Sequence, residues 1–127
     1  MEMNFECFIN QLIQISKKDH SKKILEFNYN NSNGNGPYHF LSKYSLEKFY
    51  ELNYNKEKDL LIDEDRYNYI IKEYKTQIKI LMKVLTDLEY DINISNKNNQ
   101  SPLVFCIQQK NYFIAKEYLI KLNNDNI

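Results

Sequence analysis

The sequence predicts an all-α fold, and three observations support this prediction. Helix-breaking residues are scarce, with two glycines and two prolines among 127 residues, so long stretches can remain helical. Apolar residues recur at intervals of three and four over 77–89 and over 112–122, as they do on one face of an amphipathic helix. The hydrophobic fraction of 43% is sufficient for a core, and the length suits a single domain over 1–127.

Helices are expected over 4–16, 20–27, 37–43, 45–53, 65–75, 77–89, 102–109 and 112–122. Start signals support several of these boundaries. Ser101 can cap a helix whose first turn contains Pro102. The acidic run Asp63, Glu64 and Asp65 precedes a helix, where carboxylates stabilise the positive helix end. A calcium site is the other interpretation of this run, but it lacks the further oxygen ligands and the glycine of a calcium loop.

Segment 83–106 reads KVLTDLEYDINISNKNNQSPLVFC and contains a repeat motif. It resembles the ankyrin-repeat family, whose pattern runs K-L-L-L-x-x-G-A-D-V-N-x-x-D-x-x-G-x-T-P-L-H-x-A. The matching positions are Lys83, Val84, Leu85, Asp91, Ile92, Asn93, Asn96, Asn99, Ser101, Pro102 and Leu103, with Cys106 at the small Ala position. Asn99 replaces a glycine, and asparagine tolerates the left-handed backbone that this position needs. Glu89 and Tyr90 depart from the pattern, which has Gly-Ala there.

A second copy of the motif lies upstream, where Gly34, Pro37 and His39 occupy the Gly, Pro and His positions. Pro37 and Pro102 are separated by about two periods of about 33 residues. The resemblance therefore implies an ankyrin-repeat solenoid of about four stacked helix pairs, some degenerate, with units starting near 4, 37, 69 and 102. The helices 77–89 and 112–122 would then be successive outer helices that run parallel, with Leu85 and Leu119 buried.

Composition excludes several classes of function. The formal net charge is zero and Arg66 is the only arginine, which argues against nucleic-acid or membrane-surface binding, because both depend on many cationic contacts. No secretory signal is evident at the N-terminus, and no apolar stretch approaches the length of a membrane span. With only two cysteines, the chain is expected in the cytoplasm.

No catalytic, cofactor-binding or metal-binding set is predicted. Cys7 and Cys106 could be nucleophiles or metal ligands, but unpaired cysteines are commonly buried and inert, and both are expected in the core. His20 is expected at the surface. His39, by the resemblance, is expected to tie neighbouring loops together by hydrogen bonds. Gly34 and Gly36 are expected at a hairpin tip rather than in a phosphate loop, since no Lys-Ser/Thr follows them.

The resemblance implies that the chain binds another protein through a concave face of first helices and hairpin tips. By the resemblance, its expected contact residues are Asn33, Asn35, Lys43, Tyr44, Glu64, Tyr67, Lys75, Lys97, Gln100, Gln108 and Gln109, and Arg66 is expected to join them because it is next to Tyr67. Tyr44 and Tyr67 are the expected anchors, because interface energy concentrates in a few aromatic or arginine residues.

A binder without an effector domain acts by occupying its partner. The prediction is therefore a non-catalytic inhibitor, monomeric when free, such as an immunity protein that neutralises a toxin or effector. A self-associating scaffold and an enzyme with an unrecognised site are the alternatives.

Overall fold

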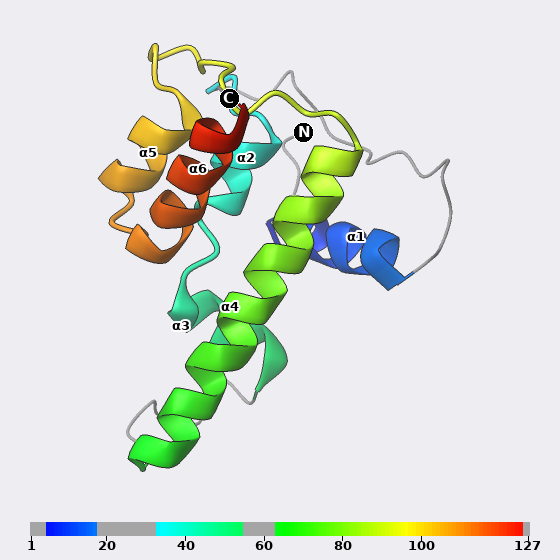
Figure 1. Cartoon of the computed structure of the whole chain (residues 1–127), viewed down its shortest axis with the longest axis vertical. Helices are drawn as coiled ribbons and strands as arrows, with labels where there is room; N and C mark the ends of the chain where they lie inside the picture. Colours follow the sequence, from blue (N-terminus) through cyan, green and yellow to red (C-terminus); the bar gives the residue numbers. More distant parts are fainter. Residues whose placement is uncertain (1–4, 18–32, 55–62, 126–127) are drawn as a thin grey trace.

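The computed structural model describes residues 5–17, 33–54 and 63–125. These residues form helices and turns without a strand, which confirms the all-α prediction (Figure 1). The helices are α1 (Phe5–Lys17), α2 (Pro37–Leu41), α3 (Leu46–Asn53), α4 (Glu64–Asp87), α5 (Pro102–Gln108) and α6 (Tyr112–Asp125). The predicted helix 20–27 lies outside the described residues. None of the described helices is long and apolar enough to cross a bilayer.

Helix α4 is continuous over 24 residues, so the prediction of two separate helices at 65–75 and 77–89 is wrong. The helix begins where the carboxylate of Asp63 accepts a hydrogen bond of 2.8 Å from the Arg66 N–H, as the acidic run predicts. The segment contains no glycine or proline. Its buried stripe also continues across the expected break, from Tyr74 to Ile78, so nothing interrupts the helix.

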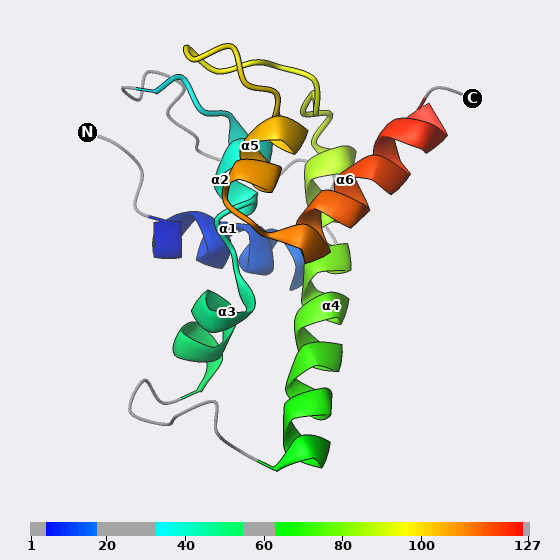
Figure 2. The same cartoon turned by 90° about the vertical axis from the view of Figure 1, so that its left-hand side faces the viewer.

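Helices α2 and α5 pack directly against each other. The rings of His39 and Phe105 meet with their centroids 5.6 Å apart. The side chain of Asn111, which follows α5, donates hydrogen bonds of 3.0 and 3.2 Å to the carbonyls of Ser42 and Tyr44, which follow α2. The sequence predicts a further helix pair between these two units. Instead, α3 and the first half of α4 extend away from α2, α5 and α6 (Figures 1 and 2).

Aromatic rings join the helices in the core. Phe8 of α1 meets Phe40 of α2 at 5.6 Å between centroids, and Tyr38 of α2 meets Tyr118 of α6 at the same distance. The hydroxyl of Tyr118 also donates to the Tyr38 carbonyl, so its polar end is satisfied although the residue is buried. The core therefore ties the first helix to the last, although they are far apart in the sequence.

The predicted burial of Leu85 is confirmed, since none of its surface is exposed. The same prediction is wrong for Leu119, which is 48% exposed. Helix α6 buries Ile114, Ala115 and Tyr118, and Leu119 lies on another side of the helix. Apolar residues occur on more than one side of α6, so their presence alone does not identify the buried face.

Three non-glycine residues in the described chain have positive φ: Glu89 at 64°, Asn99 at 63° and Lys110 at 60°. The left-handed conformation predicted for Asn99 is confirmed. Glu89 occupies the position where the ankyrin pattern has glycine. It ends α4 in a Schellman motif, with its N–H bonded to the Thr86 carbonyl at 3.0 Å and the Tyr90 N–H bonded to the Leu85 carbonyl at 3.2 Å.

Candidate functional site

The loop between α4 and α5 is organised by the side chain of Asn96, which is buried. Its Oδ1 accepts hydrogen bonds from the N–H groups of Asn98, at 3.0 Å, and Gln100, at 2.9 Å. Its Nδ2 donates at 2.9 Å to Oδ1 of Asn35 in the loop before α2. The Lys97 N–H also donates to the Asn33 carbonyl at 3.0 Å. The two loops are therefore joined at their tips.

His39 also links the loop before α2 to the loop before α5. Its Nδ1 accepts a hydrogen bond of 3.0 Å from the Gly36 N–H, and its Nε2 lies 2.9 Å from the Gln100 carbonyl. Because a carbonyl can only accept, Nε2 carries the proton and the ring is neutral. Burial lowers the pKa of His39 and outweighs the opposing effect of the Gln100 carbonyl. The predicted loop-tying hydrogen bonds of His39 are confirmed.

Five predicted contact residues lie on this side of α2 and α5 and are called the tip surface: Asn33, Lys43, Lys97, Gln100 and Gln108. All are exposed except Gln100, which is half-buried. The amide of Gln100 donates to the amide oxygen of Gln108. The ammonium of Lys43 lies 6.0 Å from the centroid of the Phe105 ring. The first contact connects the loop before α5 to the end of that helix, and the second connects the segment after α2 to the surface of α5.

The structure contradicts two predicted contact residues, because Asn35 is 2% exposed and Tyr44 is fully buried. Asn35 is held by Asn96, as described above. The Tyr44 hydroxyl donates to Gln77 on α4 and accepts from Asn53 on α3, and burial raises its pKa to about 12. Tyr44 is thus a core residue and cannot anchor a partner.

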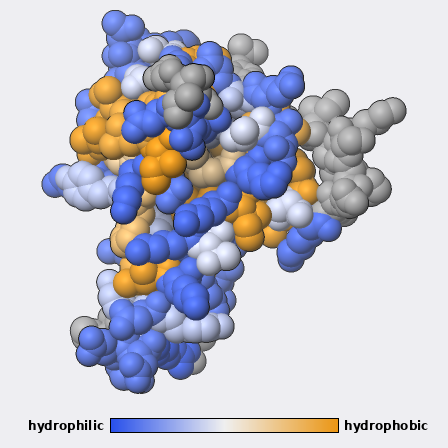
Figure 3. All heavy atoms as spheres, in the orientation of Figure 1, coloured by the Kyte–Doolittle hydropathy of each residue, from blue (hydrophilic) through white to orange (hydrophobic). Residues whose placement is uncertain are grey.

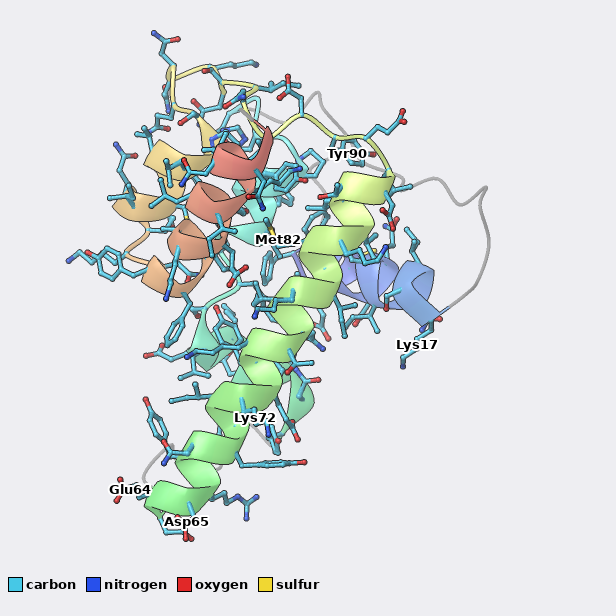
Figure 4. All side chains as sticks on the ribbon, viewed as in Figure 1. Lys17, Glu64, Asp65, Lys72, Met82 and Tyr90 are labelled. Carbon is cyan, nitrogen blue, oxygen red and sulfur yellow. The ribbon has the colours of Figure 1, made fainter. Side chains whose placement is uncertain are left out.

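The remaining predicted residues are dispersed. Glu64, Arg66 and Tyr67 are exposed at the start of α4. Figure 4 shows Glu64 at the end of this helix that is farther from Met82. Because α4 is one continuous helix and a helix rises about 1.5 Å per residue, these residues lie far from the tip surface. Gln109 is exposed at the end of α5, and Lys75 faces α6 instead.

Sequence reasoning missed the exposed apolar residues of α5 and α6. Val104 and Ile107 of α5 are 45% and 48% exposed, and Leu119 and Ile120 of α6 are 48% and 45% exposed. Figure 3 shows apolar residues gathered over these two helices at the upper left. Their signal in the sequence is a helix with apolar residues all round, which a helix on the surface rarely has.

A groove of about 410 Å³ lies between α4 and α6. Its lining residues are Tyr74, Lys75, Ile78, Lys79, Tyr112, Phe113, Lys116 and Glu117. Of these, only Lys75 belongs to the predicted contact set. The sequence does not predict this groove, because the groove depends on how closely α6 approaches α4.

The two cysteines differ in their surroundings. Cys106 is buried, as predicted, and its Sγ donates to the Asn111 carbonyl at 3.2 Å. Burial raises its pKa to about 12, which disfavours the nucleophilic thiolate. Cys7 is exposed, so its predicted burial is wrong. Helix α1 buries Phe8, Ile9 and Leu12, and Cys7 lies outside that stripe.

Among the described residues, no three His, Cys, Asp or Glu side chains gather as metal ligands.

Comparison with known proteins identifies no relative. A scan against protein-family models, a search of curated proteins and a search of solved structures each found no match to this chain.

Proposed function

We propose that this chain is a non-catalytic, ankyrin-like protein that inhibits another protein by occupying its surface. The architecture supports this proposal through α2 and α5, which pack side by side and carry linked loops at their N-terminal ends. In this arrangement α2 and the second half of α4 form one ankyrin-like helix pair, and α5 and α6 form the next. The second half of α4 and α6 are the outer helices of these pairs. Helix α3 and the first half of α4 are then an insertion within one repeat. An immunity protein that neutralises a toxin or effector is one such inhibitor.

The observation that carries the proposal is the exposed face of α5 beside the tip surface. Val104, Ile107 and Gln108 are spaced three and four residues apart and exposed on one side of this helix. Apolar side chains left exposed and bordered by polar groups are typical of protein interfaces. The hydrogen bonds of Asn96 and His39 hold the neighbouring loops in place, so little conformational entropy is lost on binding.

The charge of this surface indicates the partner. The charged members of the tip surface, Lys43 and Lys97, are both cationic. A partner that presents an apolar side chain bordered by carboxylates would complement them. The proposal of a non-catalytic protein draws support from two described groups: His39 is buried with both ring nitrogens bonded, and burial keeps Cys106 as a thiol.

The experiment is a pair of matched substitutions tested against a partner isolated from the source cell and then purified. Ile107 on α5 and Ile80 on α4 are exposed to similar extents, 48% and 45%. Ile107→Asp is expected to weaken binding by about thirtyfold, and Ile80→Asp is expected to leave the affinity unchanged. Melting temperatures would verify that both variants fold. Equal affinities for the two variants would exclude the α5 face as the binding surface.

The activity of the purified partner separates inhibition from simple association. Stoichiometric wild-type protein is expected to suppress that activity, and Ile107→Asp is expected to fail at the same concentration. A partner that binds but keeps full activity would argue against an inhibitor.

A self-associating scaffold is the second candidate, favoured by the exposure of Leu119 and Ile120 on α6. Sedimentation of the protein alone over a range of concentrations tests it. A single monomeric species at every concentration would remove this candidate, and a dimer that Leu119→Asp dissociates would support it.

A further inference from the structure

The groove between α4 and α6 lies apart from the tip surface, and we propose that it binds an acidic peptide segment carrying an aromatic side chain. This binding site does not depend on the proposed inhibitory function. It follows from the shape, the floor and the charge of the groove.

The two walls of the groove have the same residue spacing. Helix α4 contributes Tyr74, Lys75, Ile78 and Lys79, and α6 contributes Tyr112, Phe113, Lys116 and Glu117. Each set occupies positions i, i+1, i+4 and i+5, so each wall is a continuous strip along its helix. The volume of about 410 Å³ falls within the range of small-ligand sites, and an inserted side chain with its flanking backbone is of that size class.

The floor of the groove is apolar and aromatic. Tyr74 is fully buried and Ile78 is 2% exposed. The Phe113 ring stands edge-on to the Tyr74 ring, with centroids 5.8 Å apart and planes at 87°. Phe113 nevertheless remains 40% exposed, so part of this side chain is still accessible to a ligand. An aromatic side chain from a ligand would gain both apolar burial and ring packing here.

The rim of the groove carries an excess of positive charge. Its charged residues are Lys75, Lys79, Lys116 and the single acid Glu117. Ion pairs join Lys48 to Glu51 and Lys83 to Asp87, and no ion pair between described residues involves a lysine of the groove. The Lys75 ammonium instead lies 5.1 Å from the centroid of the Phe113 ring. Cations beside an apolar floor favour a ligand with carboxylates beside an aromatic group.

Other anionic ligands fit the groove less well. Inorganic phosphate would use the lysines but leave the exposed part of Phe113 in water. Single-stranded nucleic acid could stack on the floor, but such binding needs a positive path along the backbone. The formal net charge of this chain is zero, and its one arginine, Arg66, is at the start of α4. A short acidic peptide makes use of both features of the groove without requiring an extended basic surface.

The test uses a short fluorescein-labelled peptide with a central phenylalanine flanked by glutamates, measured by fluorescence anisotropy. Saturable binding to the wild-type protein is expected. Lys79→Glu combined with Lys116→Glu is expected to weaken it at least about tenfold, because attraction becomes repulsion on both walls. The matched control combines Lys17→Glu with Lys83→Glu, which changes the net charge equally without altering the groove. This control is expected to bind within about twofold of the wild type.

Several results would overturn the proposal. The first is the absence of saturable binding to the wild-type protein, and the second is equal weakening in the groove and control variants. The third is undiminished affinity for a peptide whose phenylalanine is replaced by serine, since charge alone would then account for binding. The fourth is displacement of the peptide by inorganic phosphate or a single-stranded oligonucleotide at a lower concentration than by unlabelled peptide. Ile107→Asp, which alters the α5 face alone, is expected to bind the peptide normally, so the two proposed sites can fail independently.

Discussion

The imidazole of His39 and the backbone carbonyl of Gln100 are 61 residues apart in the sequence and 2.9 Å apart in the structure. This hydrogen bond joins the start of α2 to the residue before the cap of α5. The bond requires that Nε2 keep its proton while Nδ1 accepts from Gly36. A second proton on the ring would turn Nδ1 from an acceptor into a donor and break that contact.

The protein is therefore expected to lose stability as the pH falls. Burial lowers the pKa of folded His39 below its usual value of 6.5, so the unfolded chain takes up the proton first. Above pH 6.5 His39 is neutral in both the folded and the unfolded chain, so it adds no pH dependence to the free energy of unfolding. Below pH 6.5 the unfolded chain binds the proton more readily, so stability is lost as the pH falls towards the pKa of the folded state. Unfolding in denaturant at about pH 7.5 and about pH 5.5 is the measurement. The decrease in unfolding free energy is expected to be smaller in His39→Gln, which keeps every carboxylate of the wild type. Equal decreases in the two proteins would show that His39 does not contribute.

Two identical substitutions at Leu85 and Leu119 are expected to have different costs. Leu85 is fully buried on α4 and Leu119 is 48% exposed on α6. Leu85→Ala is expected to lower the free energy of unfolding by about 2–5 kcal/mol, because it leaves a cavity. Leu119→Ala is expected to change it by about 0.5 kcal/mol or less. Chemical denaturation of both variants checks this. A comparable loss in Leu119→Ala would indicate that this residue is covered in solution.

Glycine at position 89 is expected to stabilise the protein. Glu89 has a φ of 64°, a left-handed conformation that a side chain disfavours by about 1–2 kcal/mol. Part of this gain is lost because glycine makes the unfolded chain more flexible. Glu89→Gly is therefore expected to raise the free energy of unfolding by about 0.5–1 kcal/mol. Glu89→Ala is the control, since it removes the carboxylate but keeps the Cβ. If the alanine variant proved as stable as the glycine variant, the backbone would not be the cause.

Features set by neighbouring residues could be predicted from the sequence. The cap at Ser101 accepts a hydrogen bond from the Val104 N–H at 3.2 Å, and Asn99 takes the expected left-handed backbone. Each of these depends on a few consecutive residues, so the sequence alone contains the necessary information. The helical class follows in the same way from apolar spacing and the scarcity of helix breakers.

The tertiary structure decided which helices meet and which of their faces are buried. The spacing of Pro37 and Pro102 predicts a helix pair between α2 and α5, yet these two helices touch. The sequence predicts Tyr44 as a surface anchor, but it is a core residue, whereas Val104 and Ile107 are exposed. An apolar residue shows only that burial would be favourable, and the contacts that bury it come from segments distant in the sequence. The groove between α4 and α6 depends on the same long-range packing, because neither helix forms it alone.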